Sequence, residues 1–463
     1  MKFLLINATK GFLFFSNRKK ENTIELSHIP PLGLLYIARS LEDEGHSVEI
    51  IDFYNERNPF EKIRDAVAPA DVVGFTVYVQ NYVKIAEIAD EIKKIKPNIP
   101  IIIGGPHCTF HPEKALIDVP AADISVEGEG ERVIKDIAKA LDGRKKLSTI
   151  SGVYYREHAE IKKGKPAEII NDLDSIPTPS RHLVDKYHYG KVNKVDFYKQ
   201  KVTSMATSRG CPFQCRFCSR HVMPIRIYRQ RSAENVVEEF KEINERYGSV
   251  IIVDDNFLAD KKRAHKIMDR LIESGTHLEI YILGARVDSA DRGLYIKMKK
   301  AGVKHIQFGI ESGNQDVLDF YKKNVTLRQI RDAVNLASEM NFLIVATFIF
   351  GAPIENEQHI KQTMKFVNSL PLDIALFSPL FYEHGSDLWI EAEKQNKIKK
   401  DDQYIVSADS RRGLGNFTSE ELLEFCKIAF KKFYLRPQYL MRSTFKSIMR
   451  KDLSLIKIGM KYL

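Results

Sequence analysis

The sequence predicts an α/β protein made of two parallel-sheet domains and a helical C-terminal region. Short apolar segments alternate with amphipathic segments over residues 1–143, and a second series of the same kind occupies residues 195–385. Parallel sheets that are buried on both faces produce this alternation. We therefore expect a doubly wound domain at 1–143, a linker at 144–194, a partial barrel at 195–385 and a C-terminal region at 386–463.

In the first domain, each apolar segment is followed by an amphipathic one, which favours a flavodoxin-like sheet. The expected strands are 2–8, 47–53, 71–78, 99–105 and 123–129, and the expected helices are 32–45, 58–70, 82–97, 111–118 and 130–143. Such sheets bind ligands at the carboxyl ends of their strands, where glycine lets a ligand approach the backbone. The candidate binding residues at these ends are Thr9, Gly74, Thr76, Val77, Gly105, Pro106, His107, Glu127 and Gly128.

Residues 144–194 are charged and rich in turn-forming residues, so we expect a linker with one hairpin. The second domain then repeats a strand–helix unit six times, two short of a closed eight-stranded barrel. We therefore expect a partial (βα)6 barrel. Its expected strands are 202–210, 249–256, 278–286, 305–312, 343–351 and 373–380, and its expected helices are 233–248, 261–275, 292–302, 314–324, 326–341 and 356–370.

Three of the five cysteines, Cys211, Cys215 and Cys218, lie within the segment CPFQCRFC, directly after the first barrel strand. Barrels of this kind place their chemistry at the carboxyl ends of the strands. Thiolates bind iron–sulfur clusters, and a four-iron cluster needs one ligand for each iron. Three cysteines therefore leave one iron open to a small molecule that carries an amine and a carboxylate. The alternative is a structural zinc ion bound by the same cysteines and His221.

The segment CPFQCRFC also resembles the C-x₃-C-x-aromatic-C motif of the radical S-adenosylmethionine (radical SAM) superfamily, with Phe217 at the aromatic position. Supporting segments end the next four expected strands: DDNF, GARVD, FGIESG and FGAP. The resemblance covers residues 195–385. It implies that a 4Fe-4S cluster binds SAM at its open iron. One electron from the cluster then cleaves SAM to methionine and a 5′-deoxyadenosyl radical, which abstracts hydrogen from carbon.

The residue types at the strand ends suit a sulfonium amino acid. Asp255 and Glu311 can bind its ammonium and ribose hydroxyl groups, and Arg286 can pair with its carboxylate. An internal ion pair of Arg286 is the alternative. The expected SAM-binding residues are Phe217, Asp255, Arg286, Glu311 and Ser312.

The first domain resembles the cobalamin-binding-type domain that precedes the barrel in one branch of this superfamily. The segments PPLGLLYIARSLEDEGHSVEIID, DVVGFTV, IIIGGPH and EGEGE carry the resemblance, which implies cobalamin as a further cofactor. The D-x-H-x-x-G motif of the methionine synthase and mutase type is absent. The resemblance therefore implies cobalamin without a protein histidine beneath cobalt, or a domain that has lost the cofactor. His107 is a candidate axial ligand, and a surface or cap residue is the alternative. The tRNA methylthiotransferase branch needs three N-terminal cysteines for a second cluster. Residues 1–143 contain only Cys108, which excludes that branch.

The net charge of +10 is concentrated in the tail, since residues 427–463 hold ten Lys or Arg and one acid, Asp452. We predict a helix with an apolar face opposite a basic face. The apolar residues are Met441, Phe445, Ile448, Met449, Leu455 and Ile456, and the basic ones are Arg442, Lys446, Arg450 and Lys457. Such a helix either lies on a membrane surface or closes the barrel with its basic face in solvent. Because the tail lacks a base-stacking platform, nucleic acid is not the expected partner.

The resemblance implies an enzyme that acts on an unactivated carbon of a hydrophobic substrate, such as a lipid, by C-methylation or by radical carbon–carbon bond formation or cyclisation. The alternative is a cobalamin or redox sensor without turnover. Tyr382 and His384 are candidate substrate-side residues because they follow the last barrel strand. A ferredoxin or flavodoxin is the expected electron donor. We find no signal peptide or transmembrane stretch and expect a cytoplasmic protein, with the membrane surface as the site of the tail.

Overall fold

The structure is a computed structural model that describes residues 1–9, 29–158, 160–192, 195–198, 200–219, 227–399, 402 and 404–460. The chain divides between Tyr189 and Gly190 into two compact units. The first unit therefore extends beyond residue 143 and includes most of the segment that we expected to be a linker. The second unit contains the barrel and the C-terminal region.

The first unit is built on a seven-stranded sheet with the order β2-β1-β3-β4-β5-β6-β7. Strands β1 to β5 are parallel, and their order confirms the predicted flavodoxin-like sheet. The expected hairpin is present as β6 and β7, which extend the sheet because β6 pairs antiparallel with the edge of β5. The strands are β1 (Lys2–Asn7), β2 (Ser47–Asp52), β3 (Val72–Thr76), β4 (Ile101–Gly104), β5 (Ile124–Val126), β6 (Val153–Glu157) and β7 (Glu160–Lys163).

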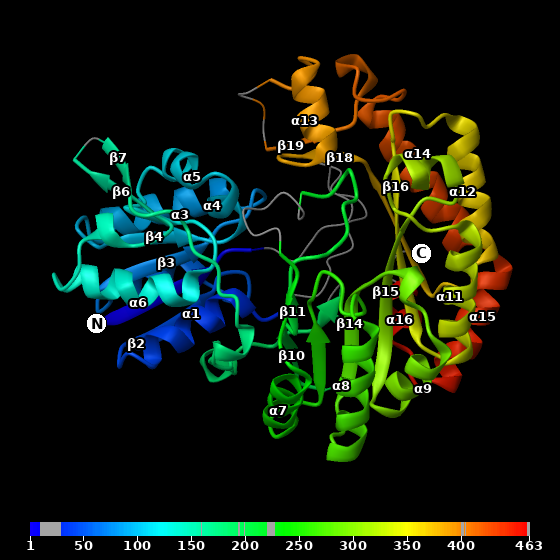
Figure 1. Ribbon diagram of the computed structural model, residues 1–463, viewed down its shortest axis with the longest axis horizontal. Helices are drawn as coiled ribbons and strands as arrows, with labels where there is room; N and C mark the ends of the chain where they lie inside the picture. Colours follow the sequence, from blue (N-terminus) through cyan, green and yellow to red (C-terminus); the bar gives the residue numbers. More distant parts are fainter. Residues whose placement is uncertain are drawn as a thin grey trace. The chain divides into compact units, whose positions relative to one another are not determined.

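Helices cover both faces of this sheet, as Figure 1 shows. One face packs its apolar side chains, such as Phe3, against α1 and α6, and the other packs side chains such as Leu4 against α2, α3 and α5. Neighbouring residues of a strand point to opposite faces, so a fully apolar strand serves both cores. The helices are α1 (Leu32–Glu42), α2 (Pro59–Val67), α3 (Tyr82–Ile95), α4 (Pro106–Phe110), α5 (Pro112–Asp118) and α6 (Gly130–Leu141).

The second unit contains a six-stranded sheet with the order β10-β13-β14-β15-β16-β17. Every neighbouring pair is parallel, and helices connect successive strands on the outer side of the sheet (Figure 1). This arrangement confirms the predicted partial (βα)6 barrel. The strands are β10 (Val202–Met205), β13 (Ser249–Ile252), β14 (Glu279–Ala285), β15 (Val303–Glu311), β16 (Leu343–Phe350) and β17 (Ile374–Pro379). The helices are α7 (Ala233–Asn244), α8 (Lys261–Ser274), α9 (Arg292–Lys300), α10 (Gln315–Phe320), α11 (Leu327–Glu339) and α12 (Glu357–Ser369).

The C-terminal region begins with two short strands that have a helix between them, and it ends with three helices. Strand β18 (Phe381–Glu383) pairs with β19 (Ile405–Ser407), and α13 (Asp387–Lys394) lies between them in the chain. Helix α14 (Ser419–Tyr434) packs on β17, where the Tyr434 hydroxyl bonds to both the N–H and the carbonyl of Ala375, each at 3.1 Å. The remaining helices are α15 (Pro437–Met449) and α16 (Ser454–Met460). No described helix has the length and apolar character needed to cross a bilayer.

The basic face of α15 is turned toward the barrel, not toward solvent. Arg442 donates to the carbonyl of Leu372 at 2.6 Å. Arg450 donates to Asp373 Oδ2 at 3.0 Å, and Lys446 Nζ lies 3.6 Å from Asp373 Oδ1. Asp373 itself is only 2% exposed. We call these three cations and Asp373 the tail clamp. They correct the prediction of a solvated basic face for Arg442, Lys446 and Arg450, because an acid and carbonyl groups at the start of β17 bind them; Lys457 is exposed as predicted.

Candidate functional site

The cysteine loop leaves the barrel at the carboxyl end of β10. Its two ends are joined by a short antiparallel pair, β11 (Ser208–Arg209) and β12 (Arg229–Gln230). Asp254, at the end of β13, fixes the start of this pair, because it accepts hydrogen bonds from the Thr207 N–H and the Ser208 hydroxyl, both at 2.6 Å. Gly210 then adopts a φ of +81°, and a side chain there would meet the carbonyl of Ile227. The chain therefore turns sharply just before Cys211.

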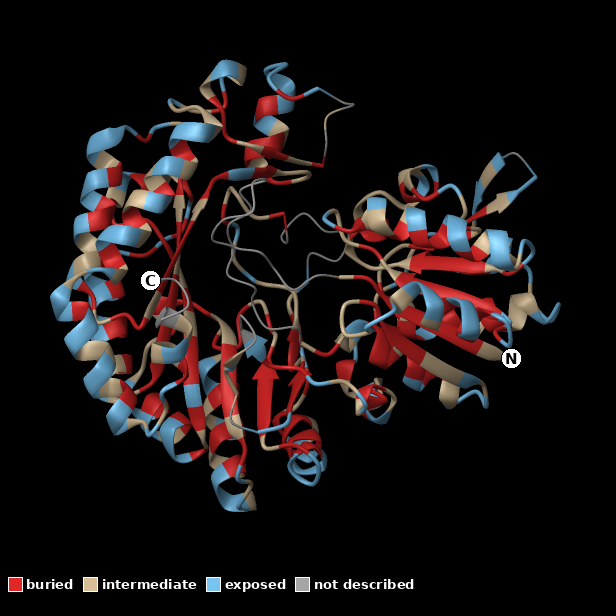
Figure 2. Cartoon of the chain, turned by 180° about the vertical axis from the view of Figure 1, so that it is seen from behind, coloured by how far each residue is buried: buried red, intermediate tan, exposed pale blue. Residues whose placement is uncertain are grey.

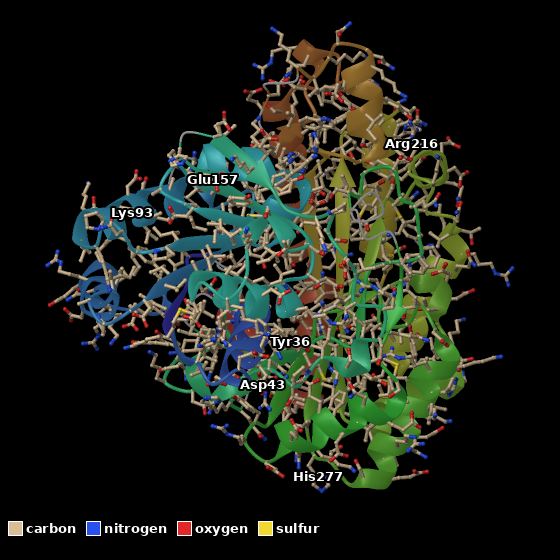
Figure 3. The ribbon with its side chains drawn as sticks, turned by 60° about the vertical axis from the view of Figure 1, so that its left-hand side comes forward. Tyr36, Asp43, Lys93, Glu157, Arg216 and His277 are labelled. Carbon is tan, nitrogen blue, oxygen red and sulfur yellow. The ribbon has the colours of Figure 1, made fainter. Side chains whose placement is uncertain are left out.

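Arg216 fastens the loop to two other elements of the second unit. Its N–H donates to the carbonyl of Tyr321 at 3.1 Å, and its own carbonyl accepts from the N–H of Leu388 in α13, also at 3.1 Å. The adjacent Phe217 ring packs edge-on against Tyr321, with ring centroids 5.0 Å apart. Figure 3 shows Arg216 and His277, which precedes β14, at opposite ends of the second unit. The loop thus lies at the carboxyl ends of the strands.

Two positively charged side chains, Arg286 and Lys323, lie near Cys215, the middle cysteine of the loop. Arg286 Nη1 lies 3.9 Å from Cys215 Sγ, and its guanidinium stacks over the Phe213 ring at 3.7 Å. Arg286 also pairs with Asp288 at 2.9 Å and donates to the carbonyl of Lys323 at 2.5 Å. The sequence analysis considered a SAM contact and an internal ion pair for this arginine. The ion pair is present, and the guanidinium is also next to a cysteine.

Lys323 and Glu311 form a buried ion pair, with 2.9 Å between Nζ and Oε1. Thr347 donates to the second carboxylate oxygen at 3.2 Å. A side chain on Gly309 would meet Glu311 Oε1 at 2.4 Å, so this position must be glycine if the pair is to form. Negative charge at Cys215 and Glu311 raises the pKa of Lys323, although burial alone would lower it.

The backbone around this ion pair is strained. Glu311 has a φ of +70°, and Lys322 and Asn324, on either side of Lys323, have φ values of +52° and +54°. Left-handed conformations at residues other than glycine cost free energy and occur often at functional sites. With these backbone conformations, the Lys323 side chain points toward Glu311. Sequence analysis missed this residue because YKKNV, between two helices, has the composition of a solvated loop.

The other expected SAM-binding residues have different surroundings. Asp255 is close enough to Cys211 for its charge to raise the pKa of that thiol, although burial is the larger cause. The Ser312 hydroxyl is fully buried, 3.1 Å from the Thr363 hydroxyl, and it accepts the N–H of Asn314 at 3.2 Å. Ser312 therefore secures the turn after β15 to α12, directly after Glu311.

Tyr382 and His384 lie on either side of Glu383, whose carboxylate accepts the Ser219 hydroxyl of the cysteine loop at 2.8 Å. Tyr382 is buried in the barrel core, and its hydroxyl donates to the carbonyl of Leu414 at 3.3 Å. Burial raises the pKa of Tyr382 to about 12. The His384 ring packs against Trp389 at 5.1 Å. Both contacts are those of packed aromatic residues.

The donor set of the loop fits an iron–sulfur cluster. Cys211, Cys215 and Cys218 form no disulfide, and Cys215 has Arg286 beside it, which favours a negatively charged group there. Within the described residues, no three His, Cys, Asp or Glu side chains converge on a single point, as the ligands of one ion would. Cysteines that each bind a different iron need not converge in this way. His221, from the zinc alternative, lies outside the described residues.

In the first unit, Asn81 joins the carboxyl ends of β1 and β3. Its side-chain amide donates to the Thr9 hydroxyl at 3.0 Å and to the carbonyl of Thr76 at 3.3 Å, and its carbonyl accepts from the N–H of Tyr78. These strands flank the point where the strand order reverses. Asn81 was not among the sequence candidates, since an asparagine before a helix usually serves as a cap.

The remaining candidates of the first unit surround the same strand ends. Gly105, with a φ of +102°, lies so close to the backbone of Val77 that a side chain would not fit. Pro106 is the first residue of α4, and Gly74 lies in β3, where a side chain would meet Leu5. Gly128 donates its N–H to Thr109, and burial raises the pKa of Glu127. The strand ends thus combine close backbone approaches with one half-buried acid.

His107 lies in the interior of the first unit. Its side chain is fully buried, its Nε2 is 2.8 Å from Asp118 Oδ2, and its ring stacks on Tyr82 at 5.4 Å. The expectation of an axial ligand requires a ring that a cofactor can reach. In this structure, the ring packs between Tyr82 of α3 and Asp118 of α5.

The chain has a flavodoxin-like domain followed by a partial barrel with thiols on a loop at its carboxyl end. This combination defines a class of iron–sulfur enzymes, and comparison with known proteins identifies the class. Residues 205–367 match the radical SAM superfamily, and residues 26–138 match the B12 binding domain. An uncharacterized methyltransferase of Pyrococcus horikoshii is 33% identical over 424 residues, covering 90% of each chain. The chain belongs to the radical SAM superfamily, in the branch with a B12 binding domain.

Two further relatives have names that specify a reaction. The anaerobic magnesium-protoporphyrin IX monomethyl ester cyclase of Rubrivivax gelatinosus is 27% identical and covers 89% of this chain and 75% of its own length. The hopanoid C-3 methylase of Methylococcus capsulatus is also 27% identical, with 79% and 69% covered. These relatives are enzymes, so the comparisons favour an enzyme over the alternative of a cobalamin or redox sensor without turnover.

Solved structures show the same fold. The radical SAM methyltransferase TsrM of Kitasatospora setae aligns with a TM-score of 0.70 at 18% identity, covering 85% of this chain and 78% of its own. The cobalamin-dependent radical enzyme OxsB aligns with a TM-score of 0.71, also at 18% identity, covering 99% and 72%. The cofactors of this enzyme are accordingly a 4Fe-4S cluster, SAM and cobalamin.

Proposed function

We propose that the protein transfers a methyl group to, or forms a carbon–carbon bond at, an unactivated carbon of a hydrophobic, lipid-like substrate. The observation that carries this proposal is the loop of three cysteines without a disulfide, beside Arg286 at the carboxyl end of the barrel. The hopanoid methylase and the methyltransferase of P. horikoshii favour methylation, and the ester cyclase favours bond formation.

We assign the cluster to Cys211, Cys215 and Cys218. When bound, the cluster supplies the electron that cleaves SAM. Arg286 and Lys323 place two positive charges near Cys215, where they stabilise an anionic cluster and suit a SAM carboxylate. Glu311 presents the one buried carboxylate of this group and suits the SAM ammonium. Phe217 and Asp255 complete the proposed SAM site.

Cobalamin is assigned to the carboxyl ends of β1, β3, β4 and β5. Gly105 lets the start of α4 approach the backbone of Val77, at the end of β3, closely. Asn81 holds the first two of these ends together through Thr9 and Thr76. We propose that the enzyme works in the cytosol with a ferredoxin or flavodoxin as reductant, and at a membrane surface through its tail.

Anaerobic incubation with a reductant and SAM that carries a deuterated methyl group tests the function. We expect release of methionine and 5′-deoxyadenosine even without substrate. With a lipid extract, methylation produces a labelled lipid together with S-adenosylhomocysteine, whereas carbon–carbon coupling produces an unlabelled product. An iron-replete preparation that releases no 5′-deoxyadenosine would contradict the proposal.

Replacing Lys323 with methionine tests the assigned SAM site. We expect the Kd for SAM to rise and the midpoint potential of the cluster to fall by on the order of tens of millivolts, because a positive charge near Cys215 is lost. Equilibrium dialysis and a redox titration followed by EPR measure these values. Lys323→Arg keeps the charge and should restore the potential.

The matched control is Lys322→Met. Lys322 is the same residue type at the neighbouring position, but it is exposed and pairs with Asp387 at 3.6 Å. We expect the Kd of this variant for SAM and the midpoint potential of its cluster to equal those of the unsubstituted enzyme. Equal shifts in both methionine variants would show that the effect is not specific to the buried ion pair.

A further inference from the structure

Helix α15 presents an apolar face to solvent. Five large side chains of this face are between 47% and 66% exposed, and a surface residue such as Met441 or Phe445 is separated from the next by one helical turn. We call this set the apolar stripe. Its members are Leu440, Met441, Phe445, Ile448 and Met449. Contiguous exposed apolar residues of this size are uncommon in monomeric proteins and mark interaction sites.

The tail clamp explains why this face is outward. Arg442, Lys446 and Arg450 lie on the opposite side of α15 and are bound to the start of β17. Figure 1 shows α15 on the outside of the second unit, and Figure 2 shows the outer helices there with much exposed surface. The stripe is therefore held at the surface by charged contacts and not left there by a loosely attached helix.

The segments before and after α15 carry exposed positive charge. Lys431 and Lys432 precede α15, and Lys451 and Lys457 follow it, all four with exposed side chains. The one acid after Glu424, Asp452, accepts the N–H of Ser454. A second copy of the chain docked on the stripe would bring the lysines of both copies together, which is electrostatically unfavourable. An anionic lipid surface instead complements both the lysines and the apolar residues.

We propose that the apolar stripe docks the protein on an anionic lipid bilayer. The five side chains enter the boundary between headgroups and acyl chains, and the exposed lysines contact the headgroups. Docking gives the enzyme access to a hydrophobic substrate, and this role of the docking rests on the proposed function. The docking itself follows from the tail alone.

Flotation of the intact, anaerobically prepared enzyme with vesicles tests this inference. We expect binding to vesicles of phosphatidylglycerol and phosphatidylcholine, and weaker binding to phosphatidylcholine alone or at high salt. The triple variant Met441→Ser/Phe445→Ser/Ile448→Ser should bind vesicles about tenfold more weakly than the unsubstituted enzyme, or not at all. Its Tm should not fall, because the three side chains face solvent. Should it fail to fold, Met441→Asp alone provides the same test.

The matched control is Val83→Ser/Ile117→Ser, which removes two side chains of the first unit that are 58% and 61% exposed. This variant should bind vesicles as the unsubstituted enzyme does. The inference is overturned by unchanged binding of the α15 variant, by no binding of the unsubstituted enzyme, or by a dimer that the α15 variant converts to a monomer. Release of 5′-deoxyadenosine, measured on the same samples, tests the proposed function separately.

Discussion

Replacing Cys215 with alanine abolishes the release of 5′-deoxyadenosine and leaves the protein with little iron. Each of the three cysteines is assigned to one iron of the cluster, so the loss of one leaves two irons without a protein ligand. Cys215 is the most informative choice because its thiol is buried and lies 3.9 Å from Arg286. Iron and sulfide analysis, together with the EPR spectrum of the reduced protein, measures the expected loss.

Cys426→Ala is the control for this experiment. Cys426 lies in α14 within the apolar core, and burial raises the pKa of its thiol, as expected for a structural cysteine. The control should retain its iron and its activity. A cluster that survives in Cys215→Ala, or that is lost equally in Cys426→Ala, would overturn the assignment of the ligands.

The second large effect is expected at Asp373. In Asp373→Asn, Arg450 and Lys446 lose their shared anion while their side chains remain largely buried. Breaking a buried ion pair on one side typically costs about 3–5 kcal/mol, and we expect a decrease of that size in the free energy of unfolding. The amide can still accept the N–H of Ile344, so the change removes mainly charge. Urea denaturation measures the decrease.

Asp269→Asn provides the comparison. Asp269 pairs with Lys297 at 2.7 Å, but both side chains are substantially exposed. Exposed pairs contribute roughly 0–1 kcal/mol, so this variant should be almost as stable as the unsubstituted protein. Similar losses in the two variants would mean that the tail clamp stabilises the fold no more than a surface pair does.

The fold could be predicted from sequence because its signals are local. The apolar runs of β1 and β16 mark strands buried on both faces, and CPFQCRFC identifies the loop that carries the thiols. The orientation of α15 could not be predicted in the same way. A helix with one apolar and one basic face usually turns the basic face to water, and the groups that reverse it, near Asp373, are distant in the sequence.

The site was only partly predictable for a related reason. Arg286 and Glu311 lie at strand ends, where the fold brings side chains together, so their position alone made them candidates. Lys323 comes from the connection between α10 and α11, and it reaches Glu311 only because the backbone on both sides is left-handed. Ser312 also lies at a strand end, but its contact with Thr363 of α12 could not be read from the sequence.

The attachment of Arg216 to α13 limits how far the chain can be shortened to a minimal catalytic fragment. A fragment ending at β17 would keep all six parallel strands and the three cysteines of the loop. It would nevertheless lack the N–H of Leu388 that the carbonyl of Arg216 accepts, and the carboxylate of Glu383 that accepts the hydroxyl of Ser219. A truncated or grafted barrel therefore has to include residues 381–394, since they hold the cysteine loop in place from outside the six-stranded sheet.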